Sequence, residues 1–273
     1  MQLTPYQLRK YQEDGFVLLP NAFSAAEIKG LKAELPRIFA EETPARIAEA
    51  QSKTVRSVYG PHRTNKSFKR LSEDARLVEP AMQVVNSDVY IYQFKINAKQ
   101  AFEGDVWEWH QDYIFWRDED GMPEPRVTNV AVYLDEVTDF NGPMFFIPGS
   151  HRHGVISVDG QDTRSAKSGT ERSPEWISNL TAKLKYSLQR ETVADLCTEL
   201  GLASSKGAAG TVLLFDSNVV HSSPNNISPF DRVMVIGTYN SVKNIPTKLQ
   251  RPDFLVSRDY EPILPVQPAA LVS

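Results

Sequence analysis

Two histidines and one aspartate stand at a spacing from which a metal centre can be built. His110 and Asp112 lie two residues apart in Trp-His-Gln-Asp, and His221 follows much later in Val-His-Ser-Ser. Two imidazoles and one carboxylate cover one face of a metal ion and leave the opposite face open, which suits an Fe(II) centre that also holds a cosubstrate and O2. On a strand, this spacing puts both side chains on one side of the sheet, so we expect one strand to carry His110 and Asp112. A strand distant in sequence would supply His221.

Taken alone, the His-x-Asp tripeptide is weak evidence, because the chain has five histidines and 34 acidic residues and short motifs recur by chance. The alternatives are a hydrogen-bonded pair at a strand end for His110 and Asp112, and a hydrogen-bonded core histidine for His221. A second metal site over 150–153 is less well supported, since a turn after Pro148 and Gly149 explains the local glycine and serine.

Arg232 is a candidate for recognition of an anion. A guanidinium binds a carboxylate through two parallel hydrogen bonds and stays charged at working pH. The alternative is a surface salt bridge with Asp231. Alternation with Val233 and Val235 along the predicted strand favours the anion-binding role.

Composition and charge restrict the class of protein. The 273 residues are 41% hydrophobic and 23% charged, which is ordinary for a globular protein. A net charge of −4 argues against general nucleic-acid binding, which usually needs a basic face. The single cysteine, Cys197, excludes an internal disulfide and a cysteine-based zinc cluster, and we expect it as a small buried residue of a helix over 192–201.

The sequence also indicates a compartment and a class of partner. Residues 1–6 are polar and form no signal peptide, and no apolar run is long enough to predict a membrane span. The lone cysteine fits a reducing compartment. We expect a cytoplasmic protein that binds a small molecule, with neither nucleic acid nor membrane as a partner.

Helical signals dominate the first 50 residues. A helix over 4–14 is expected to end at Gly15, and a short strand follows over 16–20. A capping box at Ser24 begins a second helix, which Pro36 is expected to kink or help end.

From Val89 onward, short runs of alternating apolar and polar residues indicate β-structure. The expected strands cover 89–96, 106–110, 127–134, 144–147, 211–216 and 232–239. Many short strands with long connections favour an antiparallel sandwich or jelly roll, mainly β with flanking helices.

We expect one domain over 1–273. Its parts would be a helical segment over about 1–50, a β core over about 85–158 and 207–242, and a polar insertion over about 159–206. The insertion interrupts the β pattern and is expected to cover the core as a lid.

Three segments together resemble the phytanoyl-CoA dioxygenase family. They are Trp109–Asp112, the stretch 141–152 with its Gly-Pro-x-x-x-x-Pro-Gly-Ser-His motif, and His221 with Arg232. The resemblance runs from about residue 16 to 239. It implies an Fe(II)- and 2-oxoglutarate-dependent oxygenase on a double-stranded β-helix, a cupin-like jelly roll. The stretch 116–123 is similar to the corresponding part of ectoine hydroxylases, a bacterial branch of the family.

The resemblance also implies roles for individual residues. His110, Asp112 and His221 would be the catalytic iron ligands. Arg232, with Ser223 as its hydroxyl partner, would bind the distal carboxylate of 2-oxoglutarate. The positions of Gln93 and Thr128 imply that both line the cosubstrate pocket.

A substrate cavity is expected beside the ligand pair, where five aromatic residues cluster within 107–116. Most should belong to the core, and the resemblance implies that Trp116 lines the cavity. Tyr59, Arg56 and Arg117 are polar groups that could orient a small zwitterion, the alternative for each charge being a solvated loop position.

The implied activity is hydroxylation of an unactivated C–H bond with O2, releasing succinate and CO2. Related halogenases replace the carboxylate ligand with a small residue, so Asp112 favours hydroxylation over chlorination; desaturation and cyclisation stay open. We expect a free aliphatic L-amino acid, leucine- or proline-like, as substrate. The alternatives are ectoine, a natural-product intermediate or an acyl-CoA, the last made less favourable because the sequence has no pronounced basic run. A non-redox ligand-binding β-sandwich is the alternative of another class, and Asp112 with Arg232 argues against it.

Overall fold

Two antiparallel sheets form the centre of the computed structural model, which describes residues 1–156, 175–178, 180, 182 and 184–267. The larger sheet has, in spatial order, β1 (Phe16–Leu19), β9 (Val212–Asp216), β6 (Val127–Tyr133), β11 (Arg232–Ser241), β4 (Val89–Lys99), β3 (Val55–Tyr59) and β2 (Arg46–Ala48). The smaller has β5 (Trp107–His110), β10 (His221–Ser223), β7 (Phe145–Phe146) and β8 (Ala203–Ser204). The expected jelly-roll architecture, mainly β with flanking helices, is confirmed.

The central strands of the larger sheet are buried on both faces. In β6, Val130 and Val132 pack against the helix-covered side, whereas Ala131 and Tyr133 face the smaller sheet together with Phe146. This follows from the two-residue period of a strand. Each central strand therefore contributes one set of side chains to the outer core and the alternate set to the space between the sheets.

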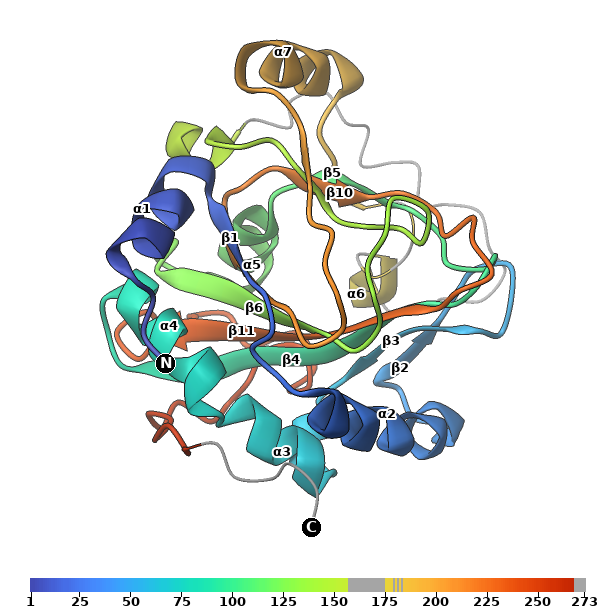
Figure 1. Cartoon of the computed structure of the whole chain (residues 1–273). Coiled ribbons are helices and arrows are strands. Elements are labelled where there is room, and N and C mark those ends of the chain that lie inside the picture. Colours follow the sequence, from blue (N-terminus) through green and yellow to red (C-terminus); the bar gives the residue numbers. More distant parts are fainter. Residues whose placement is uncertain (157–174, 179, 181, 183, 268–273) are drawn as a thin grey trace.

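Helices cover the outer face of the larger sheet (Figure 1). They are α2 (Ala25–Ala40), α3 (Lys66–Ser72) and α4 (Ala75–Val85), while α1 (Pro5–Asp14) lies beside β1. Thr4 and Ser24 each form a capping box, and Gly15 ends α1 with φ 83°, a value that favours glycine. Helix α2 continues past Pro36 to Ala40.

The remaining helices lie toward the smaller sheet. They are α5 (Asp112–Asp120), α6 (Glu175–Ser178) and α7 (Arg190–Leu200). The 3₁₀ turn η1 (Pro61–Arg63) contacts α3 and β4, and η2 (Ser150–His153) contacts α1 through His151. Cys197 is half-buried in α7. The expected insertion over 159–206 lies partly outside the described residues. Within the described part of the chain, no helix has the length and apolarity needed to cross a membrane.

Candidate active site

The two histidines meet because β5 and β10 pair antiparallel with His110 opposite His221. The His110 Nε2 lies 3.5 Å from Asp112 Oδ1, and the His221 Nε2 lies 3.9 Å from Asp112 Oδ2. The three potential ligand atoms all lie within 4.8 Å of one another. All three groups are largely shielded from solvent. Side chains far apart in sequence thus form a compact two-histidine, one-carboxylate group.

The prediction that one strand carries both His110 and Asp112 is wrong. Strand β5 ends at His110, and Asp112 is the first residue of α5. The Gln111 side-chain amide fixes this strand-to-helix turn, since it donates to the carbonyls of Gly154 (2.7 Å) and Asn218 (2.6 Å). A carboxylate in a first helical turn also benefits from the helix dipole.

Each histidine is oriented so that one ring nitrogen can bind a metal. The Nδ1 of His110 lies 2.6 Å from the Glu108 carbonyl oxygen, and the Nδ1 of His221 lies 3.0 Å from that of Val219. A carbonyl only accepts, so each Nδ1 carries the hydrogen and each Nε2 presents a lone pair toward Asp112.

The carboxylate is oriented by a second pair of side chains. Asn129 donates its amide to Asp112 Oδ2 (2.8 Å), and Thr238 donates its hydroxyl to the Asn129 oxygen (2.7 Å). Asn129 lies on the inner face of β6 and Thr238 opposite it on β11. The chain therefore fixes the rotamer of the acid without neutralising its charge.

The protonation states of these groups suit Fe(II). Burial, together with the nearby His110, lowers the pKa of His221 to about 4, so its ring is neutral at neutral pH. Burial would raise the pKa of Asp112, but the adjacent His110 and His221 hold it well below its usual value. Neutral imidazole and ionised carboxylate are the forms that coordinate metal. The donor set therefore fits an iron(II) ion held by His110, Asp112 and His221.

Arg232 lies at the start of β11 and points between the sheets. Its guanidinium donates to Asn97 Oδ1 (2.9 Å) and Ser223 Oγ (3.3 Å), and its Nε is buried with no partner. No carboxylate of the described residues forms an ion pair with it, although only 1% of the residue is exposed. Burial lowers its pKa to about 10. A buried cation without a counter-ion is costly, and a carboxylate of the cosubstrate would supply one.

Arg232 and the metal group line one cavity of about 90 Å³. Met144, Phe215 and Ile236 belong to the core cluster on one side of it. Tyr59, Phe115, Trp116, Leu180 and Leu184, from a different cluster, line the other side. Two apolar clusters and the metal group thus line the same cavity.

Several residues predicted for the site do line this cavity, namely Ser223, Gln93, Tyr59 and Trp116. Three do not. Thr128 points to the helix-covered face, where its hydroxyl contacts Tyr11 and Phe215. It occupies the strand position next to the inward-facing Asn129, and a shift of one residue reverses the face.

The two other predicted substrate contacts, Arg56 and Arg117, also lie outside the cavity wall. Arg56 pairs with Glu49 at 2.9 Å and stacks on the Trp107 ring at 3.7 Å, so it supports a lining residue from behind. The helical turn of α5 carries Arg117 away from the cavity, so its side chain is exposed. It pairs there with Asp118.

Sequence reasoning missed several charged or polar residues of the cavity, among them Lys95 and Asn97 on β4 and Arg251 in the C-terminal segment. The signal for the first two was the alternation of polar and apolar residues from Gln93 to Lys99. The polar set faces the space between the sheets instead of solvent. Arg251 has no comparable local signal.

The jelly-roll fold, the metal group and the buried arginine in the same cavity are the features expected of an iron(II)- and 2-oxoglutarate-dependent oxygenase. A family model described as Phytanoyl-CoA dioxygenase (PhyH) matches residues 11–234, and the chain belongs to this family. It is a 2-oxoglutarate-dependent dioxygenase, a hydroxylase of a small metabolite.

Individual relatives cover almost the whole chain. An L-proline trans-4-hydroxylase of Streptomyces griseoviridis is 41% identical over 94% of each chain. An ectoine dioxygenase of Nocardia farcinica is 34% identical over 94% of this chain and 86% of its own length. The crystal structure of EctD from S. alaskensis with 2-oxoglutarate and 5-hydroxyectoine has a TM-score of 0.82 at 32% identity, covering 99% of this chain and 89% of EctD.

Proposed function

We propose that this enzyme hydroxylates free L-proline at ring carbon 4. The relative of 41% identity is an L-proline trans-4-hydroxylase, and the site contains groups that match each part of a small cyclic amino acid. The observation that carries the proposal is the geometry of Arg251.

Arg251 is held so that part of its guanidinium is available. Its Nε donates to Asp120 Oδ1 at 2.8 Å, and its Nη2 contacts the other oxygen of Asp120 and the Tyr92 hydroxyl. Its hydrogen bonds to the described residues use only Nε and Nη2, so Nη1 has no partner among them, and the side chain lines the cavity. A buried arginine fixed on one edge presents a preoriented donor at the other, which suits a substrate carboxylate.

The imino group of proline has a matching acceptor. Gln93 donates its amide hydrogen to the Leu255 carbonyl at 3.0 Å, which leaves its side-chain oxygen free to accept a hydrogen bond. Arg251 belongs to the segment 251–256, and Gln93 donates to Leu255 in the same segment. They could therefore bind the two charged ends of one zwitterion.

The apolar wall matches the rest of the ring. Phe115, Trp116, Leu180 and Leu184 form it, and Trp116 packs edge-on against Tyr92 with ring centroids 5.3 Å apart. A cavity of about 90 Å³ is small against the roughly 300–1,000 Å³ of pockets for drug-sized ligands. This small volume favours an amino acid over an acyl-CoA.

The chain's own contribution to the reaction is positioning and exclusion of water. Bound iron and 2-oxoglutarate supply the oxidising power that inserts one oxygen atom of O2 into a C–H bond, with succinate and CO2 as co-products. Arg251 and Gln93 would hold the substrate so that one ring carbon faces the metal side, and the aromatic wall would keep water from the reacting carbon.

The proposal is tested by incubating the Fe(II)-loaded protein with 2-oxoglutarate, O2 and one of L-proline, D-proline, L-leucine, ectoine or an acyl-CoA. L-Proline is expected to raise succinate release well above the uncoupled rate and to yield an equimolar product one oxygen atom heavier, with the 4-hydroxyl located by NMR. Stimulation by ectoine alone would replace L-proline with ectoine. No stimulation by any amino acid would refute the proposal.

Replacing Arg251 with lysine is expected to raise the KM for L-proline about tenfold or more, because lysine keeps the charge beside Asp120 but lacks the planar fork. The KM for 2-oxoglutarate should stay unchanged. Steady-state kinetics with each substrate varied separately check this. Arg117→Lys is the matched control, since Arg117 pairs with Asp118 outside the cavity. Equal effects of the two substitutions would contradict the role of Arg251.

A further inference from the structure

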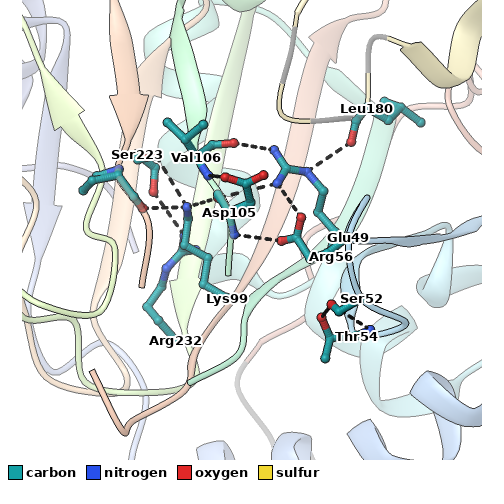
Figure 2. A network of polar contacts seen from close by, with 11 residues as sticks. Glu49, Ser52, Thr54, Arg56, Lys99, Asp105, Val106, Leu180, Ser223 and Arg232 are labelled. Atoms are coloured by element: carbon teal, nitrogen blue, oxygen red, sulfur yellow. Dashed lines mark hydrogen bonds and ion pairs between the residues drawn. The ribbon is translucent and has the colours of Figure 1, made fainter. Parts of the chain in front are cut away.

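Arg56 is a buried side chain that joins several segments of the chain. It lies on β3, and only 1% of the residue is exposed. Its Nη1 forms an ion pair with Glu49 Oε2 at 2.9 Å, its Nη2 donates to the Val106 carbonyl at 2.7 Å, and its Nε donates to the Leu180 carbonyl at 3.1 Å. Figure 2 shows the guanidinium between these three groups. The side chain therefore connects β3 with the residue before β5 and with the described part of the insertion.

Two of the residues that Arg56 contacts line the active-site cavity. They are Leu180 and Trp107. The guanidinium carbon lies 3.7 Å from the centroid of the Trp107 ring, which is within the range of a cation–π contact. A planar guanidinium can stack through its face while its edge donates hydrogen bonds. Arg56 therefore holds one wall residue from β5 and another from the insertion.

The other end of this stretch of the insertion is attached to β5. Leu184 also lines the cavity, and its backbone N–H donates to Glu108 Oε2 at 3.1 Å. The Leu188 N–H donates to the Trp109 carbonyl at 2.8 Å. Because Arg56 supplies the attachment at the first end, the two cavity-lining leucines of the insertion are held from two different strands.

Glu49 fixes the position of Arg56. Only 6% of Glu49 is exposed, and its Oε1 accepts the Asp105 backbone N–H at 3.1 Å while its Oε2 pairs with Arg56. A buried ion pair is weak evidence for stability, because the cost of removing both charges from water offsets their attraction. What the pair does supply is a defined geometry, and that geometry is imposed on the two cavity-lining neighbours of Arg56.

We propose that Arg56 is a positioning residue for the substrate: it holds Trp107 and Leu180 as parts of one fixed wall, against which the substrate is oriented toward the metal group. A wall that is fixed before binding reduces the entropy lost when the substrate is ordered. Loosening the wall should therefore weaken substrate binding and leave 2-oxoglutarate binding unchanged. The inference rests on the role of this cavity under the proposed function and does not depend on which small metabolite is bound.

Two variants separate the geometry of Arg56 from its charge. Arg56→Lys keeps a cation beside Glu49 but lacks the planar fork that reaches the Leu180 carbonyl. Arg56→Met combined with Glu49→Gln removes both charges, so no buried charge is left without a partner. The amide oxygen of glutamine can still accept the Asp105 N–H. The double substitution therefore keeps the inference testable if Arg56→Lys fails to fold.

Hydrogen exchange of the Fe(II)-loaded protein, followed by mass spectrometry without substrate, measures the attachment of the insertion directly. The amides of residues 184–188 should exchange about tenfold faster in both variants than in the wild type, which corresponds to the loss of one hydrogen bond from a charged donor. The amides of β6 should keep their wild-type exchange rates.

Steady-state kinetics measure the effect on the substrate, with the compound that stimulates succinate release. Each variant should raise the KM for that compound about tenfold and keep the KM for 2-oxoglutarate within about twofold of the wild type. Leu180→Ala should also raise the substrate KM. Adding Arg56→Lys to Leu180→Ala should raise it by a smaller factor than Arg56→Lys does alone, because the residue through which Arg56 acts is already shortened. Fully multiplicative effects would contradict this route.

Arg76→Met controls for general destabilisation, because Arg76 forms ion pairs with Glu27 and Asp74 away from the cavity. It should lower the melting temperature and leave both the exchange of residues 184–188 and the substrate KM unchanged. Wild-type exchange in both Arg56 variants would overturn the inference, and so would faster exchange with a wild-type substrate KM. If no compound stimulates succinate release, the proposed function fails, and the exchange rates alone then decide whether Arg56 holds the wall.

Discussion

Replacing Asp112 with alanine is expected to lower kcat for substrate hydroxylation by at least about 1,000-fold, equivalent to about 4 kcal/mol in activation free energy. The substitution removes the only carboxylate of the three-residue group and leaves the Asn129 amide, which donates to it at 2.8 Å, without its acceptor. Succinate and product formation measure turnover, and anaerobic titration with Fe(II) measures metal affinity, which we expect to fall as well.

Asp118→Ala is the control for this experiment. Asp118 lies on the same helix as Asp112, but it is only partly buried and pairs with Arg117. It should leave turnover and iron affinity within the range of the wild type. An Asp112→Ala protein that binds iron normally and keeps a substantial part of its turnover would show that the carboxylate is not a ligand.

Replacing Arg232 with methionine is expected to have opposite effects on cosubstrate binding and on stability. Affinity for 2-oxoglutarate should fall about 100-fold or more, equivalent to about 2.7 kcal/mol. The free energy of unfolding of the cosubstrate-free protein should rise by about 1–3 kcal/mol, because a buried cation without a carboxylate partner is replaced by an apolar group. Calorimetric titration and urea denaturation measure the two quantities.

The opposing signs distinguish a binding role from a structural one. If Arg232 only stabilised the fold, the methionine variant would be less stable, as expected for Arg76→Met with its two carboxylate partners. Addition of saturating 2-oxoglutarate should raise the melting temperature of the wild type more than that of Arg232→Met. A variant that loses stability and keeps its affinity would contradict the assignment.

The metal group was predictable from sequence because histidines are scarce in the chain and because the motifs around His110, Asp112 and His221 are recognisable. Only five histidines occur in the chain, and the strand that ends at His110 has clear alternation, whereas the short strand that carries His221 has none. The inward direction of Arg232 followed from the same alternation. These features depend on local periodicity and on identity of side chains, both of which a sequence carries.

The parts that sequence reasoning missed depend on contacts between distant residues. The aromatic run after Asp112 is typical of a strand as much as of a helix, and the turn into α5 is fixed by the Gln111 amide bonding Gly154 and Asn218. Arg251 is oriented by Asp120, 131 residues away in sequence. The placement of Thr128 was wrong by a single strand position, the smallest error that reverses a face.

Helix α5 has a consequence for where the substrate is attacked. Asp112 is its first residue and Asp120 its last, and Asp120 orients Arg251, which lines the same cavity as Asp112. Eight residues of helix span about 12 Å, so the length of α5 fixes the distance between the metal group and Arg251, the residue proposed to bind the substrate carboxylate. One inserted residue would rotate Asp120 by about 100° about the helix axis and lengthen the helix by about 1.5 Å. We therefore expect the length of α5 to determine which substrate carbon is hydroxylated as much as the shape of the cavity walls does.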